Sequence, residues 1–172
     1  DSIERHRRRA TRHDIGHNIS APPSHFHATE HPMECTVKWV GDGMSFLAET
    51  GSNHALMMDG PPEAGGRNLA PRPMELLLAG AGGCTAFDVV SILRKGRHAI
   101  DACEVSLSAE RAETDPKVFT RIHFHFRVSG KALKPEIVAR AIALSHEKYC
   151  SASIMLGKTA EISHDFEIVE TA

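Results

Sequence analysis

Two of the four cysteines lie where a thiol could do redox chemistry. Cys150 directly precedes Ser151, which is a good N-cap for a short helix ending near Gly157. The unpaired N–H groups and the dipole at a helix start stabilise a thiolate, the nucleophilic form of cysteine. Cys84 falls within "AGAGGCTAFDVVSILRK", a stretch of helical composition. The alternative for both residues is burial without reactivity, because free cysteine is among the most buried residue types.

The helix predicted around Cys84 offers its thiol no activating group. Asp88 lies four residues after Cys84 and on the same helical face, and a nearby carboxylate raises the pKa of a thiol. Glu75 lies nine residues before Cys84, which is about 180° around a helix and roughly 13.5 Å along it. Any contact of Glu75 with Cys84 would therefore come from a second chain.

The remaining cysteines and the histidines suggest no metal site. Cys35 and Cys103 alternate with polar residues in strand-like segments, as core residues do. The sequence shows neither a CxxC pair nor a signal peptide, so we expect a reducing, cytoplasmic location. His123 and His125 could chelate a metal ion from one strand face, but an exposed strand face is the simpler explanation. We expect neither a metal nor an organic cofactor.

The composition predicts one compact domain that binds neither nucleic acid nor membranes. The chain has 172 residues, 41% of them hydrophobic, and a net charge of −2. The longest uncharged apolar run, 76–87, is shorter than the roughly 20 residues of a membrane span. Residues 1–32 are arginine-rich, hold six of the twelve histidines and lack apolar periodicity. They are predicted to be a disordered or loosely attached arm before a domain of residues 33–172.

The arm has three functional alternatives, namely RNA binding, metal binding through its histidines, and a transit peptide. Acidic residues interrupt its basic run and weigh against all three.

Short strands are predicted first, followed by a long helix. The strand-like segments are 35–40, 44–49 and 54–59, with a tight turn at Gly41-Asp42-Gly43. The helix runs from Met74 to about Lys95 and is apolar nearly all round, so it should be buried on every side. Its glycines 80, 82 and 83 each cost roughly 1 kcal/mol relative to alanine. We interpret them as places where another element approaches closely, and we expect an obligate dimer around this helix.

The second half of the chain completes an α+β domain with an antiparallel sheet packed on the long helix. Strands are predicted at 103–110 and 120–129, with Thr120 and the alternate residues after it facing inward. A helix should open at Pro135 and run to about Tyr149. The short helix capped by Ser151 and a final strand around 162–168 follow.

Several of these motifs together resemble the OsmC/Ohr family of thiol peroxidases, in particular its OsmC-like, YhfA-type branch. The resemblance covers about residues 34–169 and is carried by "VKWV", "MDG", "PMEL", "GGC", "DVVSILRKGR" and "EKYCSAS". It implies the OsmC-like fold and an interlocked two-sheet homodimer. The resemblance further implies that the protein reduces an organic hydroperoxide in oxidative-stress defence and needs no cofactor. Cys84 would be the peroxidatic residue, Cys150 its disulfide partner, and a cellular dithiol the reductant.

The sequence departs from the peroxidases of that family in the groups that activate the thiol. In those proteins an arginine and a glutamate pair beside the thiolate, with the glutamate ten residues before the cysteine. Met74 holds that position here, and Glu75 is rotated from it by about 100°. Residues 33–66 contain no arginine, which leaves Arg67 and Arg72 as the nearest substitutes. Two alternatives to a peroxidase therefore stay open: a dimer that binds a small apolar or thiol-bearing ligand, and a redox sensor.

Overall fold

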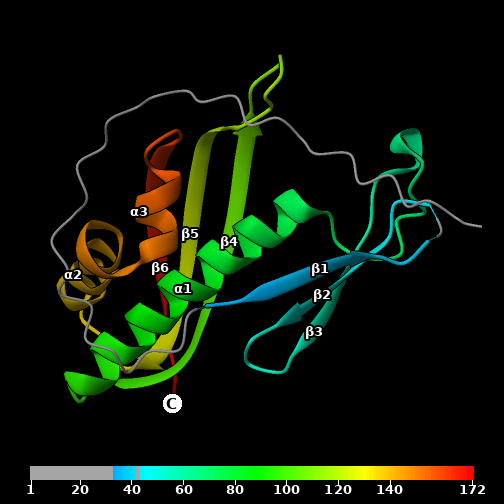
Figure 1. Ribbon diagram of the computed structural model, residues 1–172. Coiled ribbons are helices and arrows are strands. Elements are labelled where there is room, and N and C mark those ends of the chain that lie inside the picture. Colours follow the sequence, from blue (N-terminus) through cyan, green and yellow to red (C-terminus); the bar gives the residue numbers. More distant parts are fainter. Residues whose placement is uncertain (1–32, 42) are drawn as a thin grey trace, which may run out of the picture. The chain divides into compact units, whose positions relative to one another are not determined.

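The computed structural model describes residues 33–41 and 43–172, with a compact unit at Glu34–Ala172. The predicted arm, 1–32, and Asp42 of the predicted tight turn lie outside the described residues. The folded unit contains two separate three-stranded sheets, of order β1-β2-β3 and β4-β5-β6 (Figure 1). The predicted α+β class is confirmed.

The first sheet is an antiparallel meander of β1 (Cys35–Trp39), β2 (Phe46–Thr50) and β3 (Ala55–Met58). Gly41 and Gly43, which lie between β1 and β2, both have positive φ, a conformation that glycine adopts at no steric cost. Every residue of β1 is exposed, and the Trp39 side chain is 62% exposed. Within one chain this sheet therefore buries little of its apolar surface.

Asp59 organises the loop that leads from β3 into the long helix. Its carboxylate is buried and accepts hydrogen bonds from the backbone N–H groups of Gly60, Arg67 and Leu69. These bonds lower the pKa of Asp59, the Leu69 bond having the largest effect. The loop also contains the short helix η1 (Pro62–Ala64).

The long helix, α1 (Pro73–Lys95), begins where the sequence predicts. Pro73 occupies its first turn, and the Glu75 carboxylate accepts a hydrogen bond from the Arg72 backbone N–H at 2.8 Å. A Cβ at Gly82 would lie 2.7 Å from Cδ1 of Leu107 in β4, so this glycine permits a close approach of helix and sheet. A Cβ added at Gly80 or Gly83 would meet no atom of the described residues within 4 Å.

The second sheet consists of β4 (Ala99–Arg111), β5 (Phe119–Lys131) and β6 (Glu161–Glu170). The prediction of an antiparallel sheet is wrong for one pair: β4 and β5 are antiparallel, but β5 and β6 are parallel. The reason is topological, because the helical segment between β5 and β6 acts as a crossover and returns the chain in the same direction.

A second correction concerns Thr120, which was expected to face inward but is exposed. A register shift between Glu110 and Arg111 lets Phe119 occupy the buried position instead.

The helices cover the apolar side of the second sheet, and the long helix α1 contacts the other two α-helices (Figure 1). α1 packs on β4 and on α2 (Pro135–Leu144) and α3 (Ser151–Leu156). The core contains the alternate β5 residues Ile122, Phe124, Phe126 and Val128, all fully buried. The opposite side of the sheet carries exposed ion pairs such as Arg127 with Glu167 at 2.9 Å.

The predicted helix from Pro135 to Tyr149 is interrupted. α2 ends at Leu144, and a π-helical turn, η2 (Ser145–Tyr149), follows it. Cys150 then has extended backbone angles and starts α3. The N-cap of α3 is therefore Cys150 itself and not Ser151, because the Cys150 sulfur accepts the hydrogen bond from the Ser153 N–H.

His146, in η2, is held neutral by the core. Its ring packs edge-on against Phe124 and stacks on His164 at 4.9 Å. Both ring nitrogens are buried without a hydrogen-bond partner among the described residues. Burial, reinforced by the nearby His164, lowers the pKa of His146 from 6.5 to about 4.

We predict that His146 makes the fold less stable in acid. The unfolded chain takes up a proton near pH 6.5 and the folded chain only near pH 4, so stability falls as the pH decreases between these values. The loss should be about 1–2 kcal/mol, discounted for partial exposure of the ring. Urea unfolding of the His146→Phe variant at several pH values should show this dependence reduced. The control variant His54→Gln, altered at an exposed histidine, should keep the wild-type pH dependence of stability. The same pH dependence in His146→Phe as in the wild type would contradict the role given to His146.

Candidate active site

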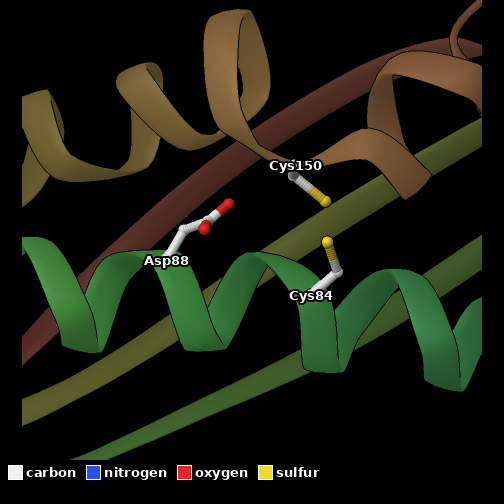
Figure 2. A group of neighbouring side chains, drawn as sticks. All are labelled: Cys84, Asp88 and Cys150. Atoms are coloured by element: carbon white, nitrogen blue, oxygen red, sulfur yellow. The ribbon is translucent and has the colours of Figure 1, made fainter. Parts of the chain in front are cut away.

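Cys84, Asp88 and Cys150 form a cluster between α1 and the start of α3 (Figure 2). One donor atom of each residue, the two sulfurs and a carboxylate oxygen, lies within 4.8 Å of the other two. Cys84 and Asp88 are one turn apart on α1, and Cys150 faces them from the junction of η2 and α3. The structure thus brings together the two cysteines that the sequence singled out.

The backbone of the first turn of α3 acts on both sulfurs. The Ser153 N–H donates to the Cys150 sulfur at 3.3 Å, and the Ala152 backbone lowers the pKa of the Cys84 thiol. Such bonds favour a thiolate, since they stabilise its charge. Cys84 therefore receives from α3 the support that its own helix cannot give. Cys150 is fully buried, whereas Cys84 is partly exposed.

Ser145 is a member of the site that the sequence did not reveal. It is fully buried, and its hydroxyl donates a hydrogen bond to the Asp88 carboxylate at 2.9 Å. No spacing rule could have identified it, because the contact joins α1 to η2 through the tertiary fold and depends on the π-helical turn. The hydrogen bond holds the Asp88 carboxylate beside the two sulfurs.

The balance of forces on Cys84 raises its thiol pKa. Burial makes the largest contribution, followed by a hydrogen bond with Cys150, and the Asp88 charge raises the pKa further. Only the Ala152 backbone hydrogen bond opposes them. The predicted effect of Asp88 is confirmed. None of the described groups that shift this pKa is a cation.

Arg72 and Glu75, the possible supporting residues, lie at the first turn of α1. They interact with each other: the Glu75 carboxylate caps the Arg72 N–H, and the Glu75 N–H donates to the Arg72 carbonyl at 3.0 Å. Neither is among the groups that shift the pKa of Cys84. Within one chain they serve the helix start rather than the thiol.

The other candidates from the sequence are placed elsewhere. His125 and His123 both contact the Asp165 carboxylate on the polar side of the second sheet, and His123 also bonds Ser163 at 2.9 Å. Cys103 is half-buried in β4, where burial raises its thiol pKa. Cys35 is exposed in this chain, contrary to the prediction of a core position.

One side of α1 is apolar and uncovered. Leu77 and Phe87 are 50% and 74% exposed, and Gly80 and Gly83 lie between them. An open groove beside this stripe runs between α1 and β4, lined in part by Gly83 and Leu107. The expectation of burial on every side is thus not met within one chain. Among the described helices, α1 alone is long and apolar enough to span a membrane by length and composition.

Comparisons with known proteins agree with this architecture. Residues 65–165 match the family described as OsmC-like protein. Protein YhfA of Escherichia coli is 51% identical over 137 residues, covering 80% of this chain and 98% of that protein. The crystal structure of an organic hydroperoxide resistance protein OsmC from Legionella pneumophila has a TM-score of 0.61 at 16% identity, over 81% and 98% of the two chains.

A second structure, the organic hydroperoxide resistance protein OhrB of Bacillus subtilis, has a TM-score of 0.56 at 18% identity, over 80% and 98%. At this level of identity, the two solved structures show only that the fold is shared. The family is shown by the match to the family model and by the 51% identity to protein YhfA. The chain belongs to the OsmC-like protein family.

Proposed function

We propose that this protein is a cysteine-based organic hydroperoxide reductase that acts in oxidative-stress defence. The observation that carries the proposal is the proximity of the Cys84 and Cys150 sulfurs, which lie within 4.8 Å of each other beside the N–H groups of α3. A disulfide requires an S–S distance of about 2.0 Å, so the two sulfurs must move closer together as the bond forms. Two family neighbours named for hydroperoxide resistance support the same chemistry.

In the proposed reaction Cys84 is the nucleophile, because it is the partly exposed thiol of the pair. Its thiolate attacks the O–O bond of the hydroperoxide, and the alkoxide leaving group takes a proton and departs as an alcohol. The sulfenic acid on Cys84 then condenses with the Cys150 thiol, forming a disulfide and water. A cellular dithiol reduces the disulfide by exchange and is itself oxidised.

The test is peptide mapping of the reduced protein after one equivalent of cumene hydroperoxide per chain. We expect a Cys84–Cys150 disulfide and one equivalent of the alcohol. Cys103 provides the internal control and should remain a free thiol, since it lies in β4 away from this pair. Hydroperoxide left unconsumed, or a disulfide that involves Cys35 or Cys103, would refute the proposal.

The protein is further proposed to act as a homodimer, with the uncovered side of α1 as part of the interface. Leu77 and Phe87 are exposed on this side, and a Cβ added at Gly80 or Gly83 would meet no atom of the described residues within 4 Å. An apolar patch of this kind on a folded unit marks an interaction surface. A second copy would also explain the exposed apolar side chains of the first sheet, including Trp39.

The second candidate function is a non-enzymatic dimer that binds a small apolar or thiol-bearing ligand, or senses redox state. It is favoured by the raised pKa of Cys84 and by the position of Arg72 and Glu75 at the helix start. A thiol pKa near 8.5 or above in the assembled protein would disfavour efficient peroxidatic chemistry.

Removing the Asp88 charge should make Cys84 more reactive. In Asp88→Asn the carboxylate no longer raises the thiol pKa, so a larger fraction is thiolate at neutral pH. Alkylation of Cys84 by iodoacetamide at pH 7, measured on the peptide that contains it, should be faster than in the wild type. The Asp165→Asn variant, altered on the polar side of the second sheet, should react like the wild type. Slower alkylation in Asp88→Asn would contradict the electrostatic argument.

A further inference from the structure

The cluster of Cys84, Asp88 and Cys150 has the donor set and the spacing of a site for a thiophilic metal ion. In a tetrahedral zinc site, bonds of about 2.3 Å place neighbouring sulfur ligands about 3.8 Å apart. The three donor atoms here are at most 4.8 Å from one another, so small side-chain rotations would give that spacing. Figure 2 shows both sulfurs and the carboxylate turned toward the same space between α1 and α3.

The surroundings of the cluster favour a cation. Asp88 is held in place by the buried Ser145 hydroxyl at 2.9 Å, which fixes the carboxylate beside the sulfurs. Two thiolates and a carboxylate in a half-buried space repel one another, and a divalent cation between them removes that repulsion. The other two donors, the sulfurs of Cys84 and Cys150, are soft ligands, and such ligands select zinc-like ions over calcium or magnesium.

We propose that the reduced protein binds one thiophilic divalent cation, such as Zn²⁺, through the Cys84 and Cys150 sulfurs and an Asp88 carboxylate oxygen. Binding forms two metal–sulfur bonds and one metal–oxygen bond, and the two thiol protons are released to solvent. No electron is transferred. A water molecule completes the four ligands, so the site keeps one open position.

This site would regulate the proposed reductase, and that part of the inference rests on the proposed function. A metal-bound Cys84 sulfur is unavailable to a hydroperoxide, so the ion inhibits turnover while it protects the reduced pair from oxidation. The disulfide has no thiolate ligands and cannot bind the ion. The sequence, which shows no CxxC pair, predicts no metal site.

The test is titration of the full-length, reduced protein with Co²⁺, followed by displacement with Zn²⁺. Thiolate-to-cobalt charge-transfer absorption in the near ultraviolet should saturate at one ion per chain and disappear as Zn²⁺ displaces it. Histidines, including the six in residues 1–32, can bind cobalt but do not produce this band. Cys84→Ser and Cys150→Ser should each lose most of the band, and Asp88→Asn should weaken binding at least about tenfold.

Matched controls separate this site from other metal ligands. Cys103→Ser and a His123→Ala/His125→Ala double variant should bind like the wild type. Absence of the thiolate band, its persistence in both Cys84→Ser and Cys150→Ser, or its loss in the histidine variant would overturn the inference.

Hydroperoxide turnover, measured with and without Zn²⁺ and then with a chelator, separates this inference from the proposed function. Turnover in the presence of chelator without any cobalt binding would overturn the metal site alone. Cobalt binding without turnover would support the metal site and refute only the reductase.

Discussion

Replacement of Cys84 by serine is expected to abolish hydroperoxide consumption. A hydroxyl in this position is far less nucleophilic than a thiolate and forms no sulfenic acid, so the first bond-breaking step is lost. We expect kcat/KM for cumene hydroperoxide to fall on the order of 10³-fold or more, as for the loss of a catalytic nucleophile. Steady-state assays of cumene hydroperoxide consumption with a dithiol reductant would measure this kcat/KM.

Cys150→Ser is expected to give a different result. Cys84 can still attack one hydroperoxide, so each chain should consume about one equivalent and then stop while the sulfenic acid persists. A sulfenic-acid trap such as dimedone should label the Cys84 peptide of this variant. Cys103→Ser serves as the control and should keep its turnover. Equal activity of Cys84→Ser and the wild type, or a burst in Cys84→Ser with none in Cys150→Ser, would show that the roles are wrongly assigned.

The second large effect is expected from a bulky side chain at Gly83. A Cβ there would meet none of the described residues within 4 Å, and leucine is a better helix former than glycine by roughly 1 kcal/mol. Gly83→Leu should therefore leave the single chain folded. In a dimer that uses this side of α1, the new side chain would overpack the interface at a cost of about 1–3 kcal/mol per copy.

Dimer affinity should consequently fall at least about tenfold, measured by sedimentation equilibrium over a concentration series. The control is Gly82→Ala, because its Cβ would lie 2.7 Å from the Leu107 side chain of the same chain. Because Cδ1 is the end of a flexible side chain, Leu107 can turn aside, and Gly82→Ala should leave the dimer affinity near the wild-type value. A wild-type protein that sediments as a monomer at all concentrations would refute the dimer, and Gly83→Leu with wild-type affinity would exclude this surface.

Local sequence patterns were sufficient for most of the secondary structure. Alternation of apolar and polar residues identified β4 and β5, and Pro73 with Glu75 marked the start of α1. The failures occurred where local pattern and tertiary packing diverge. The shift that exposes Thr120 depends on the pairing of two strands, and the parallel alignment of β6 depends on the path of the helices that precede it.

The candidate site could be foreseen only in part. The residue types and their local positions identified Cys84, Cys150 and the opposing effect of Asp88, because each depends on neighbours within one turn of a helix. Ser145 and the N–H group of Ala152 escaped detection, since they reach the cluster from a segment about sixty residues later in the chain. Sequence spacing carries no information about such contacts.

The amino-acid sequence alone was thus enough to establish the fold class, the family and the two cysteines of interest. These follow from periodicity, helix signals and shared motifs, all of which are local properties of the chain. The folded chain added the arrangement: Cys150 as the cap of α3, Asp88 fixed by Ser145, and both sulfurs beside one carboxylate within 4.8 Å. Burial and electrostatic repulsion depend on that three-dimensional proximity, so only the tertiary structure could set the chemistry of the pair.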